Sequence, residues 1–231
     1  MPVLMRFILL IVGYAFGLIQ TGYFYGKITG NDLRKEGSGN TGATNALRTH
    51  GIKAALVIFF FDALKAFIPC FAVRLIFKDD AYRFVYLLYT ALGVILGNDY
   101  PFYLRFKGGK GVAATCGYAF AWNWIYTLIG LALFFSIAFL TGYVSLASIS
   151  AAVFLFLAGI LFGFTELGGP GPVFFEFLVI LAFLQFLLIW RHRTNIKRLV
   201  SGTENRFGHK KKTAASEEAA AEVVNEEEKK L

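Results

Sequence analysis

Long apolar segments separated by short basic ones are the feature of this sequence that most restricts its fold. Most are long enough to cross about 30 Å of hydrocarbon at about 1.5 Å per residue. They run from Val3 to Tyr25, Ala54 to Phe77, Ala81 to Gly97, Val112 to Trp122, Trp124 to Leu140, Val144 to Phe164 and Val173 to Trp190. Since 57% of the 231 residues are hydrophobic and only 16% are charged, we expect an all-α, polytopic membrane helix bundle with seven transmembrane helices.

The fourth apolar segment, from Val112 to Trp122, is too short to cross a membrane upright. As a helix it reaches about 16 Å, so we expect a short, tilted or partly re-entrant element. Joining it to the fifth segment as one span would place the basic C-terminal region outside, against the positive-inside bias. Seven elements, with the N-terminus outside and the C-terminus cytoplasmic, fit the loop charges better.

The formal net charge of +8 follows from lysines and arginines that gather in the loops on the predicted cytoplasmic side. Anionic headgroups explain this charge, and no nucleic-acid partner is inferred. Both cysteines, Cys70 and Cys116, lie inside apolar segments and indicate neither a disulfide nor a metal site. Arg6 precedes an apolar run without a cleavage pattern, so we expect a retained first span.

The chain divides into two regions. Residues 1–208 are expected to form one integral membrane domain, in which loops and helix ends must supply any chemistry. Residues 209–231, HKKKTAASEEAAAEVVNEEEKKL, are a lysine cluster followed by an Ala/Glu stretch. Nothing in this second region packs a core, so we expect a charged, disordered cytoplasmic tail.

The first polar segment that could carry chemistry is RKEGSGNTGATNALRTHG, from Arg34 to Gly51. Its glycines allow sharp turns that expose backbone N–H groups, and Arg48 is available for a bidentate clamp on an anion. A short helix could begin over Ala43 to Leu47, with its N-terminal dipole facing the anion. The segment indicates a phosphate site; a flexible loop of turn formers is the alternative. Further donors come from Ser38, Asn40, Thr41, Thr44 and Asn45.

The second polar segment, from Gly97 to Thr115, contains the sequence KGGKG. Glycines allow close backbone approach at a helix N-terminus, and Lys107 and Lys110 supply positive charge around Gly108 and Gly109. We interpret this as a phosphate cradle, with a positive-inside glycine turn as the alternative. It lacks the Walker A spacing, because Gly111 replaces the Ser or Thr that would hold magnesium. Neither ATP nor another cofactor is inferred.

The third polar segment combines TGYVSLAS, from Thr141 to Ser148, with WRHRTNIKRLVSGTE, from Trp190 to Glu204. An amphipathic turn or helix after the last span would lie along the membrane interface. For Arg191 and Arg198 we favour an orientation and lipid-anchoring role. His192 and Asn195 are not needed for anchoring and are candidate site residues.

Other polar residues receive lesser roles. Asp62 and Lys65 lie three apart on one helix face and are expected to pair, with a structural or site-supporting function. Asp99 and Glu36 are interpreted as ordinary loop carboxylates. No loop cysteine, G-x-S-x-G motif or His–carboxylate cluster is present. The chain can therefore bind phosphates but offers few strong bases, which suits a substrate that arrives already activated.

Taken in order, these motifs resemble the bacterial acyl-phosphate:glycerol-3-phosphate acyltransferase family. The resemblance rests on GSGNTGATN with Arg48, a G-x-x-x-P entry before FKGGKG, TGYVSLAS, and HRTNIKRL followed by GTE. It covers most of the membrane region but not the tail. It implies a seven-span enzyme of the bacterial inner membrane, with its site open to the cytoplasm. This enzyme would transfer a fatty acyl group from acyl phosphate to the 1-hydroxyl of glycerol 3-phosphate, the first acylation step of phospholipid synthesis.

The resemblance also implies a set of site residues. Ser38, Asn40, Arg48, Lys107 and His192 are the candidate catalytic residues. The candidate substrate-binding residues are Thr41, Asn45, Asn98, Gly108, Gly109, Lys110, Ser145, Asn195 and Glu204. Asn98 stands where the family commonly has His, and an amide cannot act as an acid or base near neutral pH. This favours a positioning role at that point.

Three other functions compete with this interpretation. A permease for phosphorylated solutes also needs basic residues and glycines, but it would place its site near the midplane between inverted repeats. A structural membrane protein does not require the Gly/Ser/Asn/Thr loop beside Arg48. An acyltransferase that uses acyl-CoA or acyl carrier protein is the third, although no adenine or pantetheine surface is evident. The sequence leaves open a monomer or an oligomer.

Overall fold

The computed structural model describes residues 2–206, and within this range the chain consists of helices and loops without strands. The predicted tail, residues 209–231, lies outside the described residues. The helices are α1 (Pro2–Gly17), α2 (Thr21–Thr29), α3 (Ala43–Thr49), α4 (Gly51–Ile76), α5 (Arg83–Asp99), α6 (Val112–Trp122), α7 (Trp124–Thr141), α8 (Val144–Glu166), α9 (Pro172–Arg191) and α10 (Arg193–Val200), with short 3₁₀ turns η1 (Leu33–Lys35) and η2 (Phe102–Leu104).

The all-helical membrane prediction is confirmed, whereas the count of seven spans stays a prediction. Five segments of the described chain are long and apolar enough to cross a membrane. They are Val3–Thr29, Gly51–Ile76, Trp124–Thr141, Val144–Glu166 and Pro172–Arg191. The short fourth element forms α6 with the predicted bounds, and the chain breaks at Asn123, as expected, before α7 begins. The side chain of Asn123 caps α7 by accepting from the backbone N–H groups of Ile125 and Tyr126.

The first apolar segment departs from the prediction of one continuous span. Its helix stops at Gly17 and restarts at Thr21, so the carbonyls of Leu18 and Ile19 accept from side chains, those of Tyr103 and Lys65, and not from a helix. The side-chain amide of Gln20, which is only 2% exposed, donates to the carbonyls of Gly17, Gly97 and Asn98. An irregular backbone in a membrane protein persists only where other protein groups satisfy it. A buried amide therefore makes this break possible.

Glycine pairs bring α1 and α5 unusually close together. A Cβ added to Gly13 or to Gly93 would lie 2.1 Å from a carbonyl oxygen of the other helix. Gly17 and Gly97, one turn further along, repeat this arrangement. Small residues spaced four apart let membrane helices pack backbone against backbone. This contact fixes the end of α5, and with it the start of the cradle segment.

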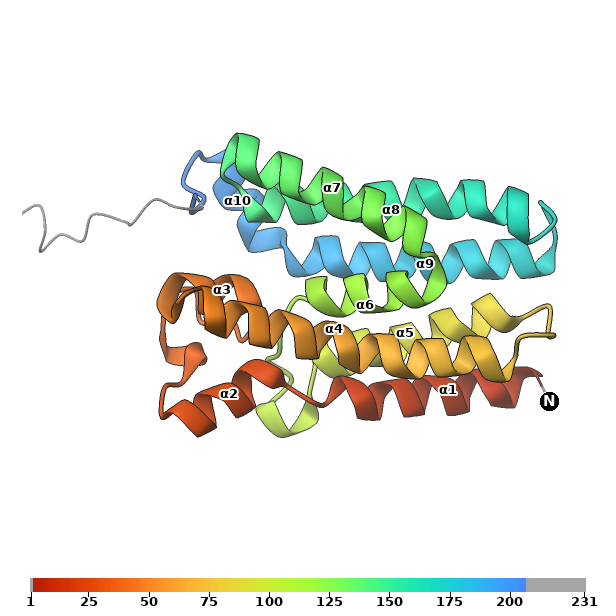
Figure 1. The fold of residues 1–231 in the computed structure, drawn as a ribbon, viewed down its shortest axis with the longest axis horizontal. Helices are drawn as coiled ribbons and strands as arrows, with labels where there is room; N and C mark the ends of the chain where they lie inside the picture. Colours follow the sequence, from red (N-terminus) through yellow and green to blue (C-terminus); the bar gives the residue numbers. More distant parts are fainter. Residues whose placement is uncertain (1, 207–231) are drawn as a thin grey trace, which may run out of the picture.

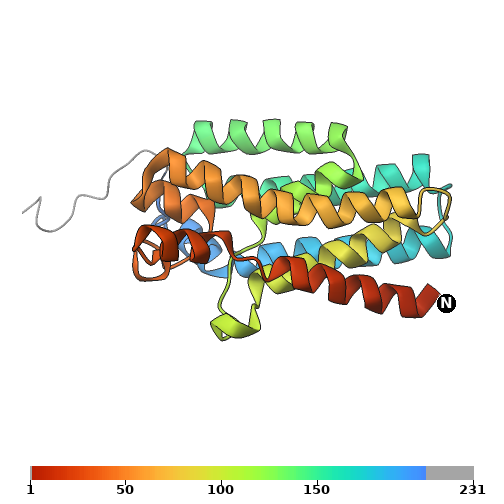
Figure 2. The same ribbon diagram turned by 60° about the horizontal axis from the view of Figure 1, so that its bottom comes forward.

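The helices form a bundle in which α6 lies between two groups, one of α1, α4 and α5 and the other of α7, α8 and α9 (Figure 1). The short helices α2, α3 and α10 gather at one end, and the described N-terminus lies at the other (Figure 1). Figure 2 shows α7 at the edge of the bundle and η2 projecting from its side near the α1–α2 break. Tyr103 in η2 donates to the Leu18 carbonyl at 2.6 Å.

Candidate active site

The KGGK segment forms a tight turn on the end of α5. The backbone N–H groups of Gly108 and Gly109 donate to the carbonyls of Asp99 and Asn98 at 3.1 and 3.0 Å. A Cβ on Gly108 would lie 2.0 Å from the Asn98 carbonyl oxygen, so only glycine fits. We call residues 107–111 the cradle. Its shape is set by direct backbone contact with the preceding helix.

Lys110 points from the cradle to the last helix of the described chain. Its Nζ donates to Oδ1 of Asn195 at 2.6 Å, across 85 residues of sequence. Gly111 caps α6 directly afterwards, so the positive end of that helix adjoins the lysine. Burial lowers the pKa of Lys110 to about 8; the nearby Arg198, Arg48 and Arg191 lower it as well, and Glu204 opposes them. A phosphate would relieve this crowding of positive charge.

Arg191 holds the cradle from the opposite side to Asn98. Its guanidinium donates to the carbonyls of Gly108 and Gly109 at 2.6 to 3.0 Å and lies 3.7 Å from the Asp99 carboxylate. The sequence favoured a lipid-anchoring role for Arg191, and these inward contacts correct that interpretation. Asp99, interpreted as an ordinary loop carboxylate, is instead fully buried. Its Oδ1 accepts from the side chain of Asn98.

Glu204 accepts hydrogen bonds from three side chains, one in α8 and two in α10. Ser145 at the start of α8, Asn195 in α10 and Arg198 donate to its carboxylate at 3.1, 2.7 and 2.7 Å. Burial alone would raise the pKa of Glu204, but these donors hold it below its usual value, so the group is ionised. Arg198 is thus paired within the protein although it stays partly exposed, a contact that its expected role as a lipid anchor did not include.

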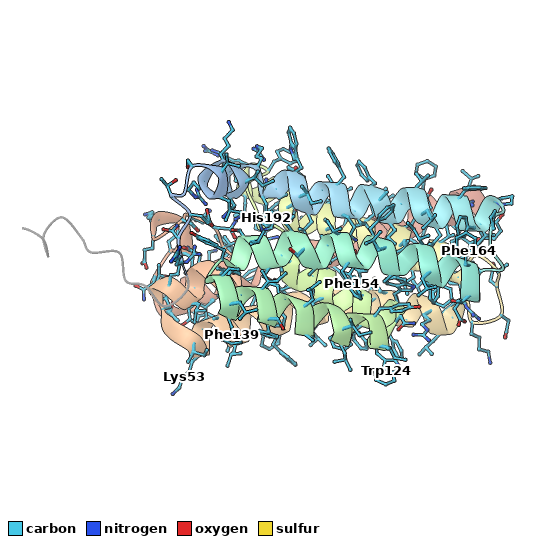
Figure 3. All side chains as sticks on the ribbon, turned by 90° about the horizontal axis from the view of Figure 1, so that it is seen from above. Lys53, Trp124, Phe139, Phe154, Phe164 and His192 are labelled. Carbon is cyan, nitrogen blue, oxygen red and sulfur yellow. The ribbon has the colours of Figure 1, made fainter. Side chains whose placement is uncertain are left out.

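His192 lies between α9 and α10 and is 3% exposed. Its Nδ1 contacts the Leu188 carbonyl at 2.8 Å, and because a carbonyl only accepts, Nδ1 carries the proton and Nε2 has a free lone pair. Burial and the charge of Lys110 lower the pKa of His192 to about 4, so the ring is neutral at pH 7. Figure 3 shows His192 and Lys53 toward the same end of the bundle, far from Phe164.

The glycine-rich loop is held by Asn45, which is 2% exposed. Its Oδ1 accepts from the N–H and hydroxyl of Ser38 at 2.8 and 3.1 Å, and its amide nitrogen donates to the carbonyls of Leu33 and Glu36. Asn40 accepts from the Gly42 N–H, and the neighbouring Thr41 is buried. The loop then enters α3, which confirms the short helix predicted from Ala43.

Arg48, in the helix that follows this loop, interacts electrostatically with Glu204 and Arg198 of the third segment. Partial burial lowers its pKa, Glu204 raises it and Arg198 lowers it, so Arg48 lies within electrostatic reach of both. Across residues 2–206, no hydrogen bond joins the glycine-rich loop to the cradle. The structure thus links the second and third motifs directly and brings the first near them through Arg48. Lys107, by contrast, is exposed.

The predicted Asp62–Lys65 pair is confirmed, with Nζ 2.6 Å from Oδ1. Asn98, at the position where the family commonly has His, accepts from the same Nζ at 2.8 Å and is 4% exposed. Lys65 and Asn98 belong to a buried polar network beneath the cradle.

An apolar cleft opens beside the polar site, between α6, α7 and α8. Its lining includes Phe59, Val112, Cys116, Phe134, Leu155 and Leu188. Val112 directly follows the cradle, and Leu188 provides the carbonyl that His192 contacts. The cleft therefore runs from the polar site into the apolar part of the bundle.

Comparisons with known proteins agree with this architecture. A sequence model described as glycerol-3-phosphate acyltransferase matches residues 7–202. A glycerol-3-phosphate acyltransferase of Aquifex aeolicus is 41% identical over 203 residues, which are 86% of this chain and 97% of that protein. One from a Thermoanaerobacter species is 38% identical over 202 residues, 87% of this chain and 94% of its own.

Solved structures give the same result. A crystal structure of PlsY, described as an integral membrane glycerol 3-phosphate acyltransferase in its glycerol 3-phosphate form, is 42% identical with a TM-score of 0.74, covering 88% of this chain and 96% of that one. Its lysophosphatidic acid form is 39% identical with a TM-score of 0.75, covering 88% and 95%. The bundle and its polar end define a membrane acyltransferase. This chain belongs to the glycerol-3-phosphate acyltransferase family.

Sequence reasoning missed two residues that shape the site. The role of Arg191 in the site could not be recognised, because arginines after a last span usually orient the protein in the membrane. Gln20 gave a clearer signal, since a lone amide within an apolar run needs hydrogen-bond partners. Its partners, the end carbonyls of α1 and α5, could be identified only from the fold.

Proposed function

We propose that this enzyme uses acyl phosphate as its donor and acylates the 1-hydroxyl of glycerol 3-phosphate, releasing lysophosphatidic acid and inorganic phosphate. The observation that carries this proposal is the joining of the cradle to the third motif. Lys110 donates to Asn195, and Asn195 donates to the ionised Glu204, which lies within electrostatic reach of Arg48. Arg48, Lys110 and Arg198 lie within electrostatic reach of this carboxylate, and Arg191 lies within reach of Lys110. Such a surplus of positive charge suits two phosphorylated substrates held side by side.

In this proposal the segments divide the work. Arg48 and Lys110 contact phosphate groups, and the exposed Lys107 assists from the rim of the cradle. Ser38, Asn40 and Thr41 provide phosphate or carbonyl contacts, and Gly108 and Gly109 let the turn pack closely on the end of α5, which positions Lys110 for a phosphate. The bracing residues, which hold these groups in place, are Asn45, Asn98, Ser145, Asn195 and Glu204.

The chemistry then needs little from the protein beyond alignment and charge. The hydroxyl oxygen of glycerol 3-phosphate attacks the carbonyl carbon, and the bond from that carbon to the phosphate oxygen breaks. Phosphate leaves without a strong acid, and its departing oxygen takes the hydroxyl proton. Holding two anions together and stabilising the oxyanion are tasks for N–H groups and cations. Nε2 of the neutral His192 is a second candidate for the proton acceptor.

The apolar cleft supports a place for the acyl tail. It begins beside Val112, next to the cradle, and is lined almost entirely by apolar side chains. A tail in the cleft would leave its phosphate at the polar end. This arrangement requires the polar end to lie at the membrane interface, and we propose that it faces the cytoplasm of a bacterial inner membrane, with the N-terminus outside. The basic residues of the loops favour that orientation.

The donor can be tested directly. Purified protein is supplied with glycerol 3-phosphate and, in parallel, acyl phosphate, acyl-CoA or acyl carrier protein loaded with the same chain. We expect turnover with acyl phosphate as the donor and none with acyl-CoA or acyl carrier protein. Turnover only with a thioester donor would overturn the proposed donor and leave the acyltransferase class intact. Uptake of a phosphorylated solute into vesicles without acyl transfer would favour a permease.

Arg48→Ala tests the site itself. We expect it to raise the KM for glycerol 3-phosphate or abolish turnover, since a bidentate charge contact to phosphate is lost. Near-normal kinetics would contradict the assignment. Arg105→Ala is the matched control, because Arg105 is an exposed arginine in the loop before the cradle that carries no assigned role.

A further inference from the structure

A buried ammonium group on α4 joins that helix to α5 and to the break between α1 and α2, beneath the cradle. Lys65 of α4 is 4% exposed, and its Nζ donates to the Ile19 carbonyl at 2.7 Å, Asp62 Oδ1 at 2.6 Å and Asn98 Oδ1 at 2.8 Å. An ammonium has three N–H donors, so every one of them is used. Such a group is fully committed to holding its neighbours and has no donor left for a ligand.

The three acceptors of Lys65 lie at structurally important points of the bundle. The Ile19 carbonyl belongs to the break between α1 and α2, where the helix no longer satisfies it. Asp62 balances the charge and also accepts from Thr21, the first residue of α2. Asn98 lies in the last turn of α5. Lys65 therefore fixes the break and the end of α5 relative to each other.

The contact with Asn98 leads on to the cradle. The carbonyl of Asn98 accepts the Gly109 N–H at 3.0 Å, and its side-chain nitrogen would lie 2.9 Å from a Cβ on Gly109. The same carbonyl accepts from Gln20 at 2.9 Å. The cradle thus rests directly on Asn98, while Arg191 holds its outward carbonyls. A shift of Asn98 would move the backbone that is proposed to hold phosphate.

We propose that Lys65 is a positioning residue for acyl transfer: acting through Asn98, it sets the geometry of the cradle at Gly108 to Lys110. This inference rests on the proposed function, in which the cradle binds a substrate phosphate. The competing role is purely structural, a tie between helices whose loss would lower stability without a specific effect on the cradle.

The central test compares Lys65→Met with two reference variants in detergent-purified protein. Arg74→Met is the matched control, because Arg74 is a cation of the same helix that also donates to backbone carbonyls, those of Ala121 and Trp122, away from the cradle. Lys110→Ala marks the effect of damaging the cradle itself. For each variant, kcat, the KM of both substrates and the thermal midpoint are measured.

The expected result is specific. Lys65→Met should lower kcat/KM by about 10- to 100-fold, as small misplacements of binding groups do. It should alter the KM of the same substrate as Lys110→Ala. Arg74→Met should leave both KM values close to those of the unchanged enzyme, even if its thermal midpoint falls as far. If Lys65→Met behaves like Arg74→Met, the positioning role is overturned.

A double-mutant cycle tests the route through Asn98. If Lys65 acts through Asn98, Lys65→Met combined with Asn98→Ala should be no worse than the more severe single variant. Effects on kcat/KM that multiply would overturn that route. Should Lys65→Met fail to fold, Asp62→Asn replaces it. This change removes the negative charge that balances Lys65 but keeps the oxygen acceptors of Ile19 and Asn98, so a smaller loss in the same KM is expected, and an unchanged KM would overturn the proposal.

Failure of this inference and failure of the proposed function give different results. Suppose that Lys110→Ala is impaired but Lys65→Met behaves like the Arg74→Met control. Only the positioning role of Lys65 would then be overturned, and the proposed function would stand. Normal kinetics in Lys110→Ala would show that the cradle does not bind phosphate, and both proposals would fall.

Discussion

The glycine-rich loop and the cradle have similar compositions but are held in different ways. Asn45 braces the loop through partners no more than 12 residues away. The cradle is held at its outer side by Arg191 and Asn195, 82 to 85 residues away in sequence. A loop that carries its own brace can be recognised in a sequence, whereas a cradle braced by the bundle depends on helix packing. Substitutions in the glycine-rich loop should therefore disturb the loop alone, whereas substitutions in the cradle should also affect its contacts with distant helices.

Among variants of Lys110, Asn45, His192 and Lys107, Lys110→Ala should have the largest effect. We expect kcat/KM to fall about 100-fold or more, because a half-buried cation directed at a charged substrate is lost. The glycine-rich loop should stay intact, since it shares no hydrogen bond with the cradle in residues 2–206. Steady-state kinetics with both substrates varied gives the measurement. Lys53→Ala, at an exposed position at the start of α4, is the control.

Asn45→Ala should come next and should damage the loop alone. The change leaves the Ser38 N–H and two carbonyls without their partner, at a cost of about 1–3 kcal/mol for each buried group left unsatisfied. We expect kcat/KM to fall about tenfold, with a lowered thermal midpoint. Asn31→Ala, at an exposed asparagine, should change neither quantity. A loss as large as that of Lys110→Ala, without any change in stability, would argue for direct substrate contact by Asn45.

The pH dependence should report the cradle. Since the pKa of Lys110 is lowered to about 8, the lysine is charged below that pH and loses its charge above it. The value of kcat/KM, which reports ionisations of the free enzyme, should therefore decline as pH rises through about 8, by up to about tenfold per pH unit. Lys110→Arg should move the decline to higher pH if it retains activity. A kcat/KM profile flat to pH 10 would contradict a charged Lys110 in binding.

His192→Ala should have a smaller effect, below about tenfold in kcat/KM, if the departing phosphate takes the proton. Loss of a general base would instead cost about 100-fold or more. Because the pKa of His192 is lowered to about 4, the kcat/KM profile should also lack a histidine inflection near pH 6.5. A large loss in His192→Ala would make Nε2 the proton acceptor.

Lys107→Ala should have the smallest effect of the series. Its side chain is exposed, and exposed charges contribute about 0–1 kcal/mol to an ionic contact. A few-fold rise in one KM is expected. If Lys107→Ala were as damaging as Lys110→Ala, the two lysines would grip the phosphate together, and the cradle would close on binding.

Much of the fold followed from the sequence, with identifiable exceptions. The bounds of α6 and the start of α3 were predictable, because Asn123 and Gly42 lie at helix boundaries where turn-forming residues are favoured. The break after Gly17 was not, since Leu18 and Ile19 continue an apolar run. Asp99 was misinterpreted because its burial comes from the packed fold, in which Arg191 of another helix lies 3.7 Å from its carboxylate.

The sequence by itself determined the membrane environment, the helical class and the segments with phosphate-binding chemistry, because hydropathy and residue type are local properties. Only the tertiary structure decided which of these segments meet. Lys110 donates to Asn195, and Arg191 donates to Gly108 and Gly109. These residues are distant in sequence and come within hydrogen-bond distance because α1 and α9 both pack on α5. The tertiary structure also sets two protonation states that the sequence does not show. Burial lowers the pKa of Lys110, and the Leu188 carbonyl fixes the tautomer of His192.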